Sequence, residues 1–264
     1  MPQAKPVVLF LVDGMRPDGL QRADTPTMDH LIATGAHTMS ARTVMPSITL
    51  PCHASLFLGV MPARHGITTN AWAPPARPVP GIFEVLHDAG HTAACFYNWE
   101  QLRDLGRPGT LDASFYVRLK HEVNSPSDQQ VATLAAGWLR DHQTDFCFVY
   151  LGYTDIAGHG VGWMTVPYLE AIAGADRCIG HVLKALPDDA LVIVTADHGG
   201  HEQAHGTDSD EDMTIPFIIS GPGIPADHTI DRPVNITDIA PTIIRQFGLE
   251  SPREWIGTPI TCNA

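Results

Sequence analysis

The amino-acid sequence predicts an α/β protein with a mostly parallel central sheet and helices on both faces. Two observations lead to this prediction. Short apolar runs, of the kind found in strands buried on both faces, alternate along the chain with longer segments of helical periodicity. Apolar runs also end at aspartate, as in Val12-Asp13 and Thr195-Ala196-Asp197, and open α/β sheets place their ligand chemistry at the carboxyl ends of strands.

Local composition sets the predicted elements in the first half of the chain. Residues 6–12 are continuously apolar and stop at Asp13-Gly14, and residues 25–35 have an apolar face at helical spacing. Prolines interrupt regular structure at 73–81, and 61–70 is a predicted loop. The expected strands are 6–12, 41–45, 91–97 and 113–120, and the expected helices are 25–35, 54–60 and 81–88.

The second half repeats the alternation of strands and helices. Residues 128–141 are amphipathic, and residues 166–186 carry Leu169, Ile172 and Ile179 on one face, as in helices packed against a sheet. The expected strands are 145–152, 190–195 and 215–220, and the expected helices are 128–141, 166–186 and 235–247. This order of elements implies a mostly parallel sheet.

The composition is that of a globular protein with an acidic surface. The chain has 264 residues, 44% of them hydrophobic, and a formal net charge of −13. We therefore expect a single domain over residues 1–264, with residues 72–120 as a candidate cap or pocket wall. The acidic balance argues against a nucleic-acid scaffold. It is compatible with a small anionic substrate that meets bound divalent cations.

The sequence contains no clear targeting segment and no regular cysteine pattern. No apolar run is long enough to span a membrane, and the six apolar residues before Asp13 are too few for a signal-peptide core, so we expect no membrane association and a cytoplasmic location. The five cysteines are scattered and include no Cys-x-x-Cys pair, which favours reduced thiols. No pattern predicts the oligomeric state.

The segment Pro46-Ser47-Ile48-Thr49-Leu50-Pro51-Cys52-His53 is the centre of the predicted chemistry. Pro51 suits the first turn of a helix, so Thr49 is expected at or just before a helix N-terminus, where backbone N–H groups favour an anion. A threonine hydroxyl is a weak nucleophile unless a base or a metal ion activates it. Taken alone, Thr49 is better explained as a helix cap or a spacer.

Acidic and imidazole side chains gather at the ends of three predicted strands. Asp13 follows the first, Asp155 precedes His159 by a turn of small residues, and Asp197-His198 is followed by His205. Each motif alone is compatible with an ordinary turn. Together, aspartate and histidine at one edge of a sheet are the ligands that zinc or manganese binds.

Five motifs carry a family resemblance that spans residues 7–221. They are Val12-Asp13-Gly14-Met15-Arg16-Pro17-Asp18, the Pro46–His53 segment followed by His65-Gly66-Ile67 and Asn70, Tyr153-Thr154-Asp155-Ile156-Ala157-Gly158-His159, Thr195-Ala196-Asp197-His198-Gly199, and His205-Gly206-Thr207. With these motifs the chain resembles the alkaline phosphatase superfamily, and most closely its nucleotide pyrophosphatase/phosphodiesterase branch. The resemblance implies an alkaline phosphatase-like fold.

The resemblance also implies roles for single residues. Asp155, His159 and His205 would hold one divalent ion, and Asp13, Asp197, His198 and Thr49 the other. Zn²⁺ is the preferred ion, with Mn²⁺ as the alternative. Thr49 would be the nucleophile that is transiently phosphorylated, while Asn70 and the Thr49 backbone N–H would hold a phosphate oxygen. The expected substrate is a small nucleotide-type phosphodiester or pyrophosphate.

Other activities remain open on the same scaffold: a phosphomonoesterase, phosphonate hydrolase or phosphomutase, or a non-catalytic metal- or nucleotide-binding protein. A monoesterase usually needs a strong cation for the extra phosphate charge, and no arginine lies within five residues of Thr49. Arg16, Arg42 and Arg64 are the nearest candidates, so this absence weakly favours a diester.

Three further details concern the surroundings of the nucleophile. Sulfatase chemistry is disfavoured because threonine cannot be converted to formylglycine. Cys52 stands where many relatives carry asparagine. The pocket walls are expected from loops at 72–80, 99–110 and 160–167, with Trp72 and Tyr153 as candidates for stacking on a substrate ring and His201 as a candidate substrate contact.

Overall fold

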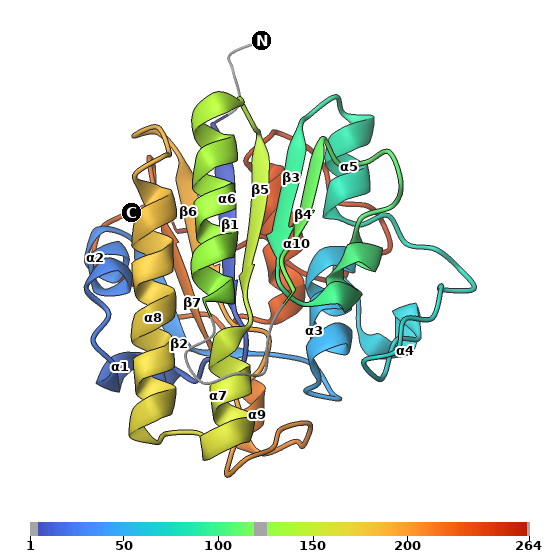
Figure 1. Cartoon of the computed structure of the whole chain (residues 1–264). Coiled ribbons are helices and arrows are strands. Elements are labelled where there is room, and N and C mark those ends of the chain that lie inside the picture. The colour runs from blue at the N-terminus through green and yellow to red at the C-terminus, as the bar shows by residue number, and fades with distance from the viewer. Residues whose placement is uncertain (1–4, 119–125, 263–264) are drawn as a thin grey trace.

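The computed structural model describes residues 5–118 and 126–262, and within them eight strands form one mixed sheet in the order β4-β3-β5-β1-β6-β7-β2-β8 (Figure 1). The strands are β1 (Val7–Val12), β2 (Ala36–Arg42), β3 (Ala93–Tyr97), β4 (Ala113–Tyr116), β5 (Phe146–Leu151), β6 (Leu191–Thr195), β7 (Thr214–Ser220) and β8 (His228–Thr229). Only β7 pairs antiparallel with its neighbours, β6 and β2. The expected mostly parallel sheet is confirmed.

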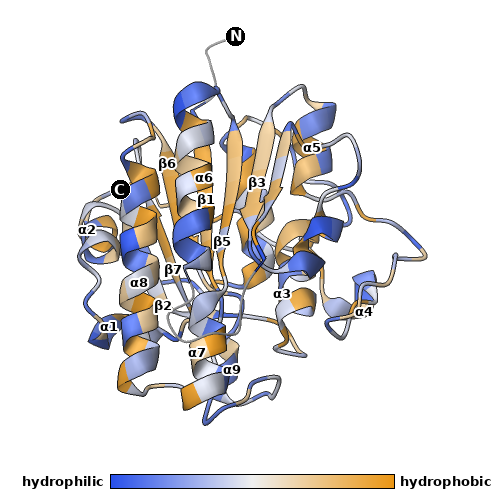
Figure 2. Ribbon diagram, in the orientation of Figure 1, coloured by the Kyte–Doolittle hydropathy of each residue, from blue (hydrophilic) through white to orange (hydrophobic). Residues whose placement is uncertain are grey.

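The centre of the sheet is apolar because it is covered on both faces. β1 pairs in parallel with β5 and with β6, and all residues of these three strands are buried. Continuous apolar runs are the pattern that such strands need. Figure 2 shows the same distribution, with strands that are mainly hydrophobic and helices in front of them that carry both hydrophilic and hydrophobic residues.

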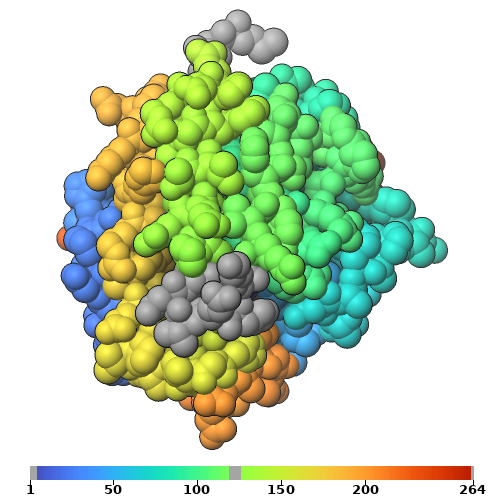
Figure 3. All heavy atoms as spheres, in the orientation of Figure 1, coloured from blue at the N-terminus to red at the C-terminus, as the bar shows by residue number. Residues whose placement is uncertain are grey.

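Helices cover both faces of the sheet, as expected. In Figure 1, α6 and α8 lie in front of the strands, and α10 lies behind them and contacts α3 and α5. Side chains of α6 and α8 cover the front face in the space-filling view (Figure 3). The helices are α1 (Pro17–Arg22), α2 (Pro26–Thr34), α3 (Thr49–Leu58), α4 (Pro62–His65), α5 (Ile82–Asp88), α6 (Ser127–Asp141), α7 (Tyr153–Val161), α8 (Val166–Leu183), α9 (Asp210–Met213) and α10 (Ile239–Arg245), with 3₁₀ turns η1 (Glu100–Leu105) and η2 (Ile236–Asp238).

Three local expectations differ from the structure. The segment from Tyr153 to Val161 is the helix α7 and not a turn of small residues, and Pro62–His65 forms a short helix within the expected loop. In α7, tertiary packing overrides the low helix propensity of Gly158 and Gly160, whereas the short helix at Pro62–His65 begins with proline, which suits the first helical turn. The strand expected at 41–45 is β2, which begins earlier, at Ala36, because it pairs antiparallel with β7. In the strand expected at 113–120, residues 119 and 120 lie outside the described residues.

The topology brings distant parts of the sequence to one edge. β1, β5 and β6 run parallel, so their carboxyl ends share an edge of the sheet, where α7 also begins. Residues 93–116 contribute β3 and β4 to this sheet. Among the described residues, no helix has the length and hydrophobicity that a membrane crossing requires.

Candidate active site

Four elements deliver the predicted site residues to the carboxyl edge of the sheet. Asp13 follows β1, Asp197 follows β6, and Asp155 lies in the first turn of α7, just after β5. Thr49 is the first residue of α3 and is buried. The expected position of Thr49 at a helix N-terminus is therefore confirmed.

The first group of side chains surrounds the Thr49 hydroxyl. His198 Nε2 lies 3.2 Å from Thr49 Oγ1, 3.3 Å from Asp13 Oδ1 and 3.3 Å from Asp197 Oδ2. All three charged or imidazole side chains are buried. The Gly14 N–H donates to Asp197 Oδ1 at 3.2 Å, and the Tyr150 hydroxyl donates to Asp13 Oδ2. One oxygen of each carboxylate is thus tied down, and the other faces His198.

The second group lies beside the first. Asp155 Oδ1 is 3.4 Å from His159 Nε2 and 3.6 Å from His205 Nε2. The rings of His205 and His198 stack with their centroids 3.8 Å apart. Among the described residues, ligand atoms lie within 4.8 Å of one another in two groups, Asp13–Asp197–His198 and Asp155–His198–His205. His159 is near Asp155 but belongs to neither group.

The three imidazoles share a hydrogen-bonding pattern that fits metal binding. His198, His159 and His205 each place Nδ1 at 2.8–2.9 Å from a backbone carbonyl, of Gly199, Gln203 and Ser47 respectively. A nitrogen beside a carbonyl oxygen must carry the proton, so each Nε2 presents a lone pair. Metal-binding histidines are held in this way.

The carboxylates point to the same conclusion. Asp13 Oδ1 and Asp197 Oδ2 are buried without a hydrogen-bond donor among the described residues, and both face the lone pair of His198 Nε2. Oxygen and nitrogen lone pairs 3.3 Å apart repel one another unless a cation lies between them. The residues present therefore fit a divalent ion in this group.

Burial controls the ionisation of the site when only protein groups are considered. It raises the pKa of Asp13 well above its ordinary value, with a further contribution from the charges of Asp197 and Asp155, and it raises the pKa of Asp197 to about 8. Burial, and then the neighbouring His198, lowers the pKa of His205 to about 3. Both effects suit metal binding, because a cation replaces protons on the carboxylates and needs a neutral imidazole.

Asn70 is oriented by the helix that begins at Thr49. Its Oδ1 accepts the Leu50 N–H at 3.0 Å, so the amide nitrogen is left as the donor. No acceptor for that nitrogen occurs in the part of the chain that the structure describes. Asn70 and Thr49 line the same cavity, so a donor and a hydroxyl face one space.

A cavity of about 620 Å³, here called the site cavity, opens over these groups. Asp13, Asp155, His159 and His205 line it, whereas Asp197 and His198 lie beneath it. Its outer wall comes from two parts of the expected 72–120 region, Trp99–Gln101 and the end of β4 with Tyr116 and Arg118. The loop expected at 160–167 contributes Gly160, and no described residue of 72–80 lines this cavity.

Of the weaker candidates, Trp72, Tyr153 and His201 are not among the residues that line the site cavity. Trp72 lines a separate cavity near Pro74. His201 Nδ1 instead lies 2.7 Å from Asp212 Oδ1, and this hydrogen bond raises the pKa of His201. Asp212 also accepts from the Thr207 N–H at 2.8 Å. Through these two hydrogen bonds, Asp212 closes the loop that carries His205.

Trp163 is a site residue that sequence reasoning missed. Its Nε1–H donates to Gly14 O at 2.9 Å, and its ring meets His159 edge-on at 5.1 Å between centroids. A Cβ on Gly158 or Gly200 would come within 2.6 Å of this ring, so only glycine admits the indole at both positions. The Gly-rich sequences after Asp155 and Asp197 were the available signal.

A buried polar pair under α7 was also missed. Asn98 Nδ2 donates to Asp128 Oδ1 at 2.6 Å, and Asn98 Oδ1 accepts the Gly152 N–H at 3.2 Å. The Tyr153 N–H points at Asp128, 3.3 Å from Oδ1. Together these bonds fix the turn from β5 into α7, which carries Asp155.

The cysteines and the candidate arginines lie away from the reacting groups. Cys52 is buried, with Sγ 3.7 Å from Pro46 O, and burial raises the pKa of its thiol. Arg16 pairs with Asp18 at 2.7 Å and Arg42 with Asp210 at 2.7 Å, while Arg64 donates to a backbone carbonyl. The cysteines within the described residues are all free thiols.

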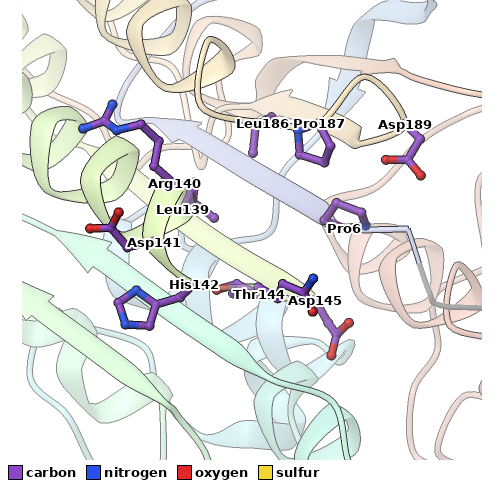
Figure 4. A pocket seen from close by; sticks show the side chains of 11 residues that line it. Pro6, Leu139, Arg140, Asp141, His142, Thr144, Asp145, Leu186, Pro187 and Asp189 are labelled. Carbon is purple, nitrogen blue, oxygen red and sulfur yellow. The ribbon is translucent and has the colours of Figure 1, made fainter.

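A second cavity, of about 430 Å³, lies at the opposite edge of the sheet (Figure 4). Pro6 and Asp145, which immediately precede β1 and β5, line it together with Arg140 and Asp189. It contains no group of metal-binding side chains, since both such groups in the described residues lie at the carboxyl edge.

A known protein family matches most of this chain. The model of the type I phosphodiesterase/nucleotide pyrophosphatase family matches residues 7–212. Ectonucleotide pyrophosphatase/phosphodiesterase family member 3 of Mus musculus is 28% identical over an alignment of 226 residues, and the match covers 74% of this chain and 25% of that protein. A 2,3-bisphosphoglycerate-independent phosphoglycerate mutase of Staphylococcus aureus is 32% identical over 120 residues, 43% of this chain and 22% of that protein. The chain spans about a quarter of the length of these curated relatives.

Solved structures share the fold at low identity. An inactive variant of murine ectonucleotide pyrophosphatase/phosphodiesterase 5 in complex with AMP superposes with a TM-score of 0.77 and 17% identity, covering 94% of this chain and 96% of that one. A 2-O GAG sulfatase gives a TM-score of 0.77 with 18% identity over 98% of this chain and 73% of that one. These likenesses support the alkaline phosphatase-like fold.

Proposed function

The chain belongs to the type I phosphodiesterase/nucleotide pyrophosphatase family, and from this premise we propose that it is a two-metal hydrolase that cleaves phosphodiester or pyrophosphate bonds in nucleotide-type substrates. The family supports hydrolysis of phosphoric esters. The finer proposal, a phospho-threonine intermediate on Thr49 with two divalent ions, draws on the geometry around that residue.

One observation carries the proposal. Three histidines with fixed Nδ1 protons aim their Nε2 lone pairs at aspartate oxygens, and the Thr49 hydroxyl lies 3.2 Å from one of these nitrogens. A structural cluster of charges would be expected to pair opposite signs. This arrangement instead gathers lone pairs, which is what a metal centre needs.

Asp13, Asp197 and His198, with Thr49, would hold one ion, and Asp155 and His205, with His159 or the shared His198, would hold the other. When bound, divalent ions supply Lewis acidity, which lowers the pKa of a hydroxyl or water and offsets charge on phosphate oxygens. Imidazole and carboxylate ligands suit Zn²⁺ and Mn²⁺. Zn²⁺ is the ion we propose.

Thr49 would carry the covalent chemistry. Its deprotonated oxygen attacks phosphorus, the bond from phosphorus to the leaving oxygen breaks, and the phosphoryl group, with its remaining ester substituent, is retained on Thr49. Water then attacks the phospho-threonine, releasing the phosphate product and restoring the hydroxyl. The hydroxyl proton leaves through the site cavity to solvent or to the leaving oxygen. Fixing the nucleophile at the start of α3 places backbone N–H groups beside the reacting phosphate.

Asn70 would bind a non-bridging phosphate oxygen. Because Leu50 N–H holds its Oδ1, its Nδ2 is pre-oriented as a donor into the cavity. A donor fixed before the substrate arrives needs no reorganisation when negative charge redistributes in phosphoryl transfer.

The main alternative is a phosphomonoesterase or phosphomutase with the same metals. The partial match to a phosphoglycerate mutase supports it. Arg16, Arg42 and Arg64 do not line the site cavity, whereas Arg118 does. We also propose that the substrates are small phosphate esters and that the protein is cytoplasmic. The single domain over residues 1–264 stays a prediction.

Hydrolysis of bis-p-nitrophenyl phosphate compared with p-nitrophenyl phosphate tests the proposal, after metal stripping and re-addition of Zn²⁺ or Mn²⁺. We expect metal-dependent turnover with diester preference. Preference for the monoester would instead support a phosphomonoesterase or phosphomutase. No turnover of either, with two equivalents of metal bound, would favour a non-catalytic protein.

Thr49→Ala separates the nucleophile from the metal ions. We expect turnover to fall by at least about a thousandfold, since a covalent step is lost, while two metals per chain remain in elemental analysis. Thr49→Ser keeps a hydroxyl and is the matched control that retains turnover. Full activity of Thr49→Ala would refute the phospho-threonine mechanism.

A further inference from the structure

The site cavity contains one arginine, and it comes from a distant part of the chain. Among the described residues that line the cavity, Arg118 is the only lysine or arginine. It stands in an acidic protein with a formal net charge of −13. Acidic residues of the same wall are Asp13, Asp155 and Glu100.

Each acidic side chain of the cavity wall lies beside a guanidinium or imidazole group of the protein. Glu100 pairs with Arg103, with 2.6 Å between Oε1 and Nη1, and Asp13 and Asp155 face the proposed metal positions. Arg118 is exposed and has no ion-pair or hydrogen-bond partner within residues 5–118 and 126–262. An exposed arginine is often only a solvated charge. Here it lies on the wall of the cavity where an anionic substrate must bind.

The sheet topology places Arg118 far from the scissile phosphate. β4 is the outermost strand, and its register is fixed by the pairing of Tyr116 with Tyr97 and by a 2.9 Å hydrogen bond from the Val117 N–H to Tyr97 O. β3 and β5 separate β4 from β1, so the β4 axis lies about 14 Å from β1, which precedes Asp13, and about 10 Å from β5, which precedes Asp155. Both separations exceed the length of one side chain.

We propose that Arg118 binds a second anionic group of the substrate, a phosphate or carboxylate outside the scissile phosphodiester. This inference rests on the proposed function. A guanidinium binds such groups through two parallel hydrogen bonds. The cavity, at about 620 Å³, has the size of a small-molecule site and can hold both groups at once. Arg118 is therefore a specificity-determining residue and takes no part in the chemical step.

Three substrates with the same reacting phosphate test the proposal. Thymidine 5′-(p-nitrophenyl phosphate) carries no second anion, its 3′-phosphorylated analogue carries one on the nucleoside side, and thymidine 5′-triphosphate carries charge on the leaving side. The variants are Arg118→Gln, Arg118→Lys and, as a control with the same loss of charge at the opposite edge of the sheet, Arg140→Gln. The measured quantity is kcat/KM for each doubly anionic substrate divided by that for the first substrate.

In Arg118→Gln we expect this ratio to fall by about tenfold to a hundredfold for at least one doubly anionic substrate, mainly through KM, because a charge-assisted hydrogen bond is lost. Arg118→Lys should give an intermediate ratio, and Arg140→Gln should leave the ratio unchanged. The substrate that responds identifies the side on which the second anion lies. An equal fall for all three substrates, or no fall for any, overturns the proposal.

Binding to a catalytically silent protein separates this inference from the proposed function. Calorimetry on the metal-loaded Thr49→Ala protein measures the affinity of the same three ligands with and without Arg118→Gln. Selective loss of affinity for a doubly anionic ligand supports the role of Arg118 even if the wild-type protein turns over none of them, a result that would refute the hydrolase alone. Equal affinities with and without Arg118 refute the anion subsite.

Discussion

Asp128 is a buried carboxylate whose replacement by asparagine should stabilise the protein at neutral pH. Its Oδ1 accepts a hydrogen bond from Asn98 Nδ2 at 2.6 Å, and the Tyr153 N–H lies 3.3 Å from Oδ1 and 3.4 Å from Oδ2. An asparagine amide oxygen in the Oδ1 position can accept the bonds made at that oxygen. The substitution Asp128→Asn therefore removes the ionisable group while it preserves the contacts that fix the start of α7.

The magnitude follows from the environment of the carboxylate. Burial raises the pKa of Asp128 from its ordinary 3.8 to about 6, although hydrogen bonds from Asn98 and from the Tyr153 N–H oppose the change. At ~1.4 kcal/mol for each pH unit between the two values, ionising the folded protein costs about 3 kcal/mol. Because the folded state holds this proton more tightly than the unfolded state, wild-type stability falls as pH rises from about 3.8 to about 6 and is level above that.

Urea unfolding of chelator-treated protein at several pH values tests this reasoning. The free energy of unfolding of Asp128→Asn minus that of the wild type should be near zero at about pH 4 and should grow to at most ~3 kcal/mol at about pH 8. Asp188→Asn, at an exposed position, is the control for loss of a surface charge. A third variant, Asp128→Ala, leaves buried donors unpaired and should be less stable than Asp128→Asn by about 1–3 kcal/mol.

A difference between Asp128→Asn and the wild type that is the same at every pH would refute the argument, because burial of the charge could then not be its cause. If Asp128→Asn is less stable than the wild type at neutral pH, the hydrogen-bond donors around Asp128 need the ionised carboxylate as their acceptor. In that case the hydrogen bonds from Asn98 and Tyr153 would outweigh desolvation.

Two further predictions concern the metal positions. In Gly158→Ala the new methyl group would lie within 2.6 Å of the Trp163 ring, so we expect a loss of about 1–3 kcal/mol in stability and weaker zinc binding in a competitive chelator titration. Gly160→Ala, on the same helix with open space around it, is the matched control and should bind zinc normally. Removing metal should lower the melting temperature, because bound ions separate the repelling groups around Asp13 and Asp197. At a metal concentration a hundredfold above Kd the stabilisation is about 2.7 kcal/mol, and equal melting temperatures in calorimetry with chelator and with zinc would contradict metal binding.

The sequence determined the central sheet because the strands in question are buried on both faces. β1, β5 and β6 were located to within a residue or two, since a continuous apolar run admits few alternatives in a globular chain. The helix α7 was mistaken for a turn because Gly158 and Gly160 lower its local helix propensity. Its stability depends on packing against Trp163, which no local pattern reveals.

The residue types of the candidate site could also be predicted from the sequence. Asp13, Asp155 and Asp197 each come at or just after the end of a strand, and strands that run parallel must deliver their ends to one edge. The motifs around Thr49 and His205 added the family resemblance. Their metal roles stay predictions, while the structure shows that they converge at the carboxyl edge of the sheet.

Tertiary structure alone decided what surrounds that site. Asn98 and Asp128 are 30 residues apart, and neither has a local signal, yet their hydrogen bond supports the start of α7. Arg118 belongs to the wall of the cavity only because β4 pairs in parallel with β3 at the rim of the sheet. The sequence by itself specified which groups can perform the chemistry, since hydrophobic periodicity and strand ends are local properties. Which groups surround the substrate depended on strand order, since that order follows from pairings between distant segments.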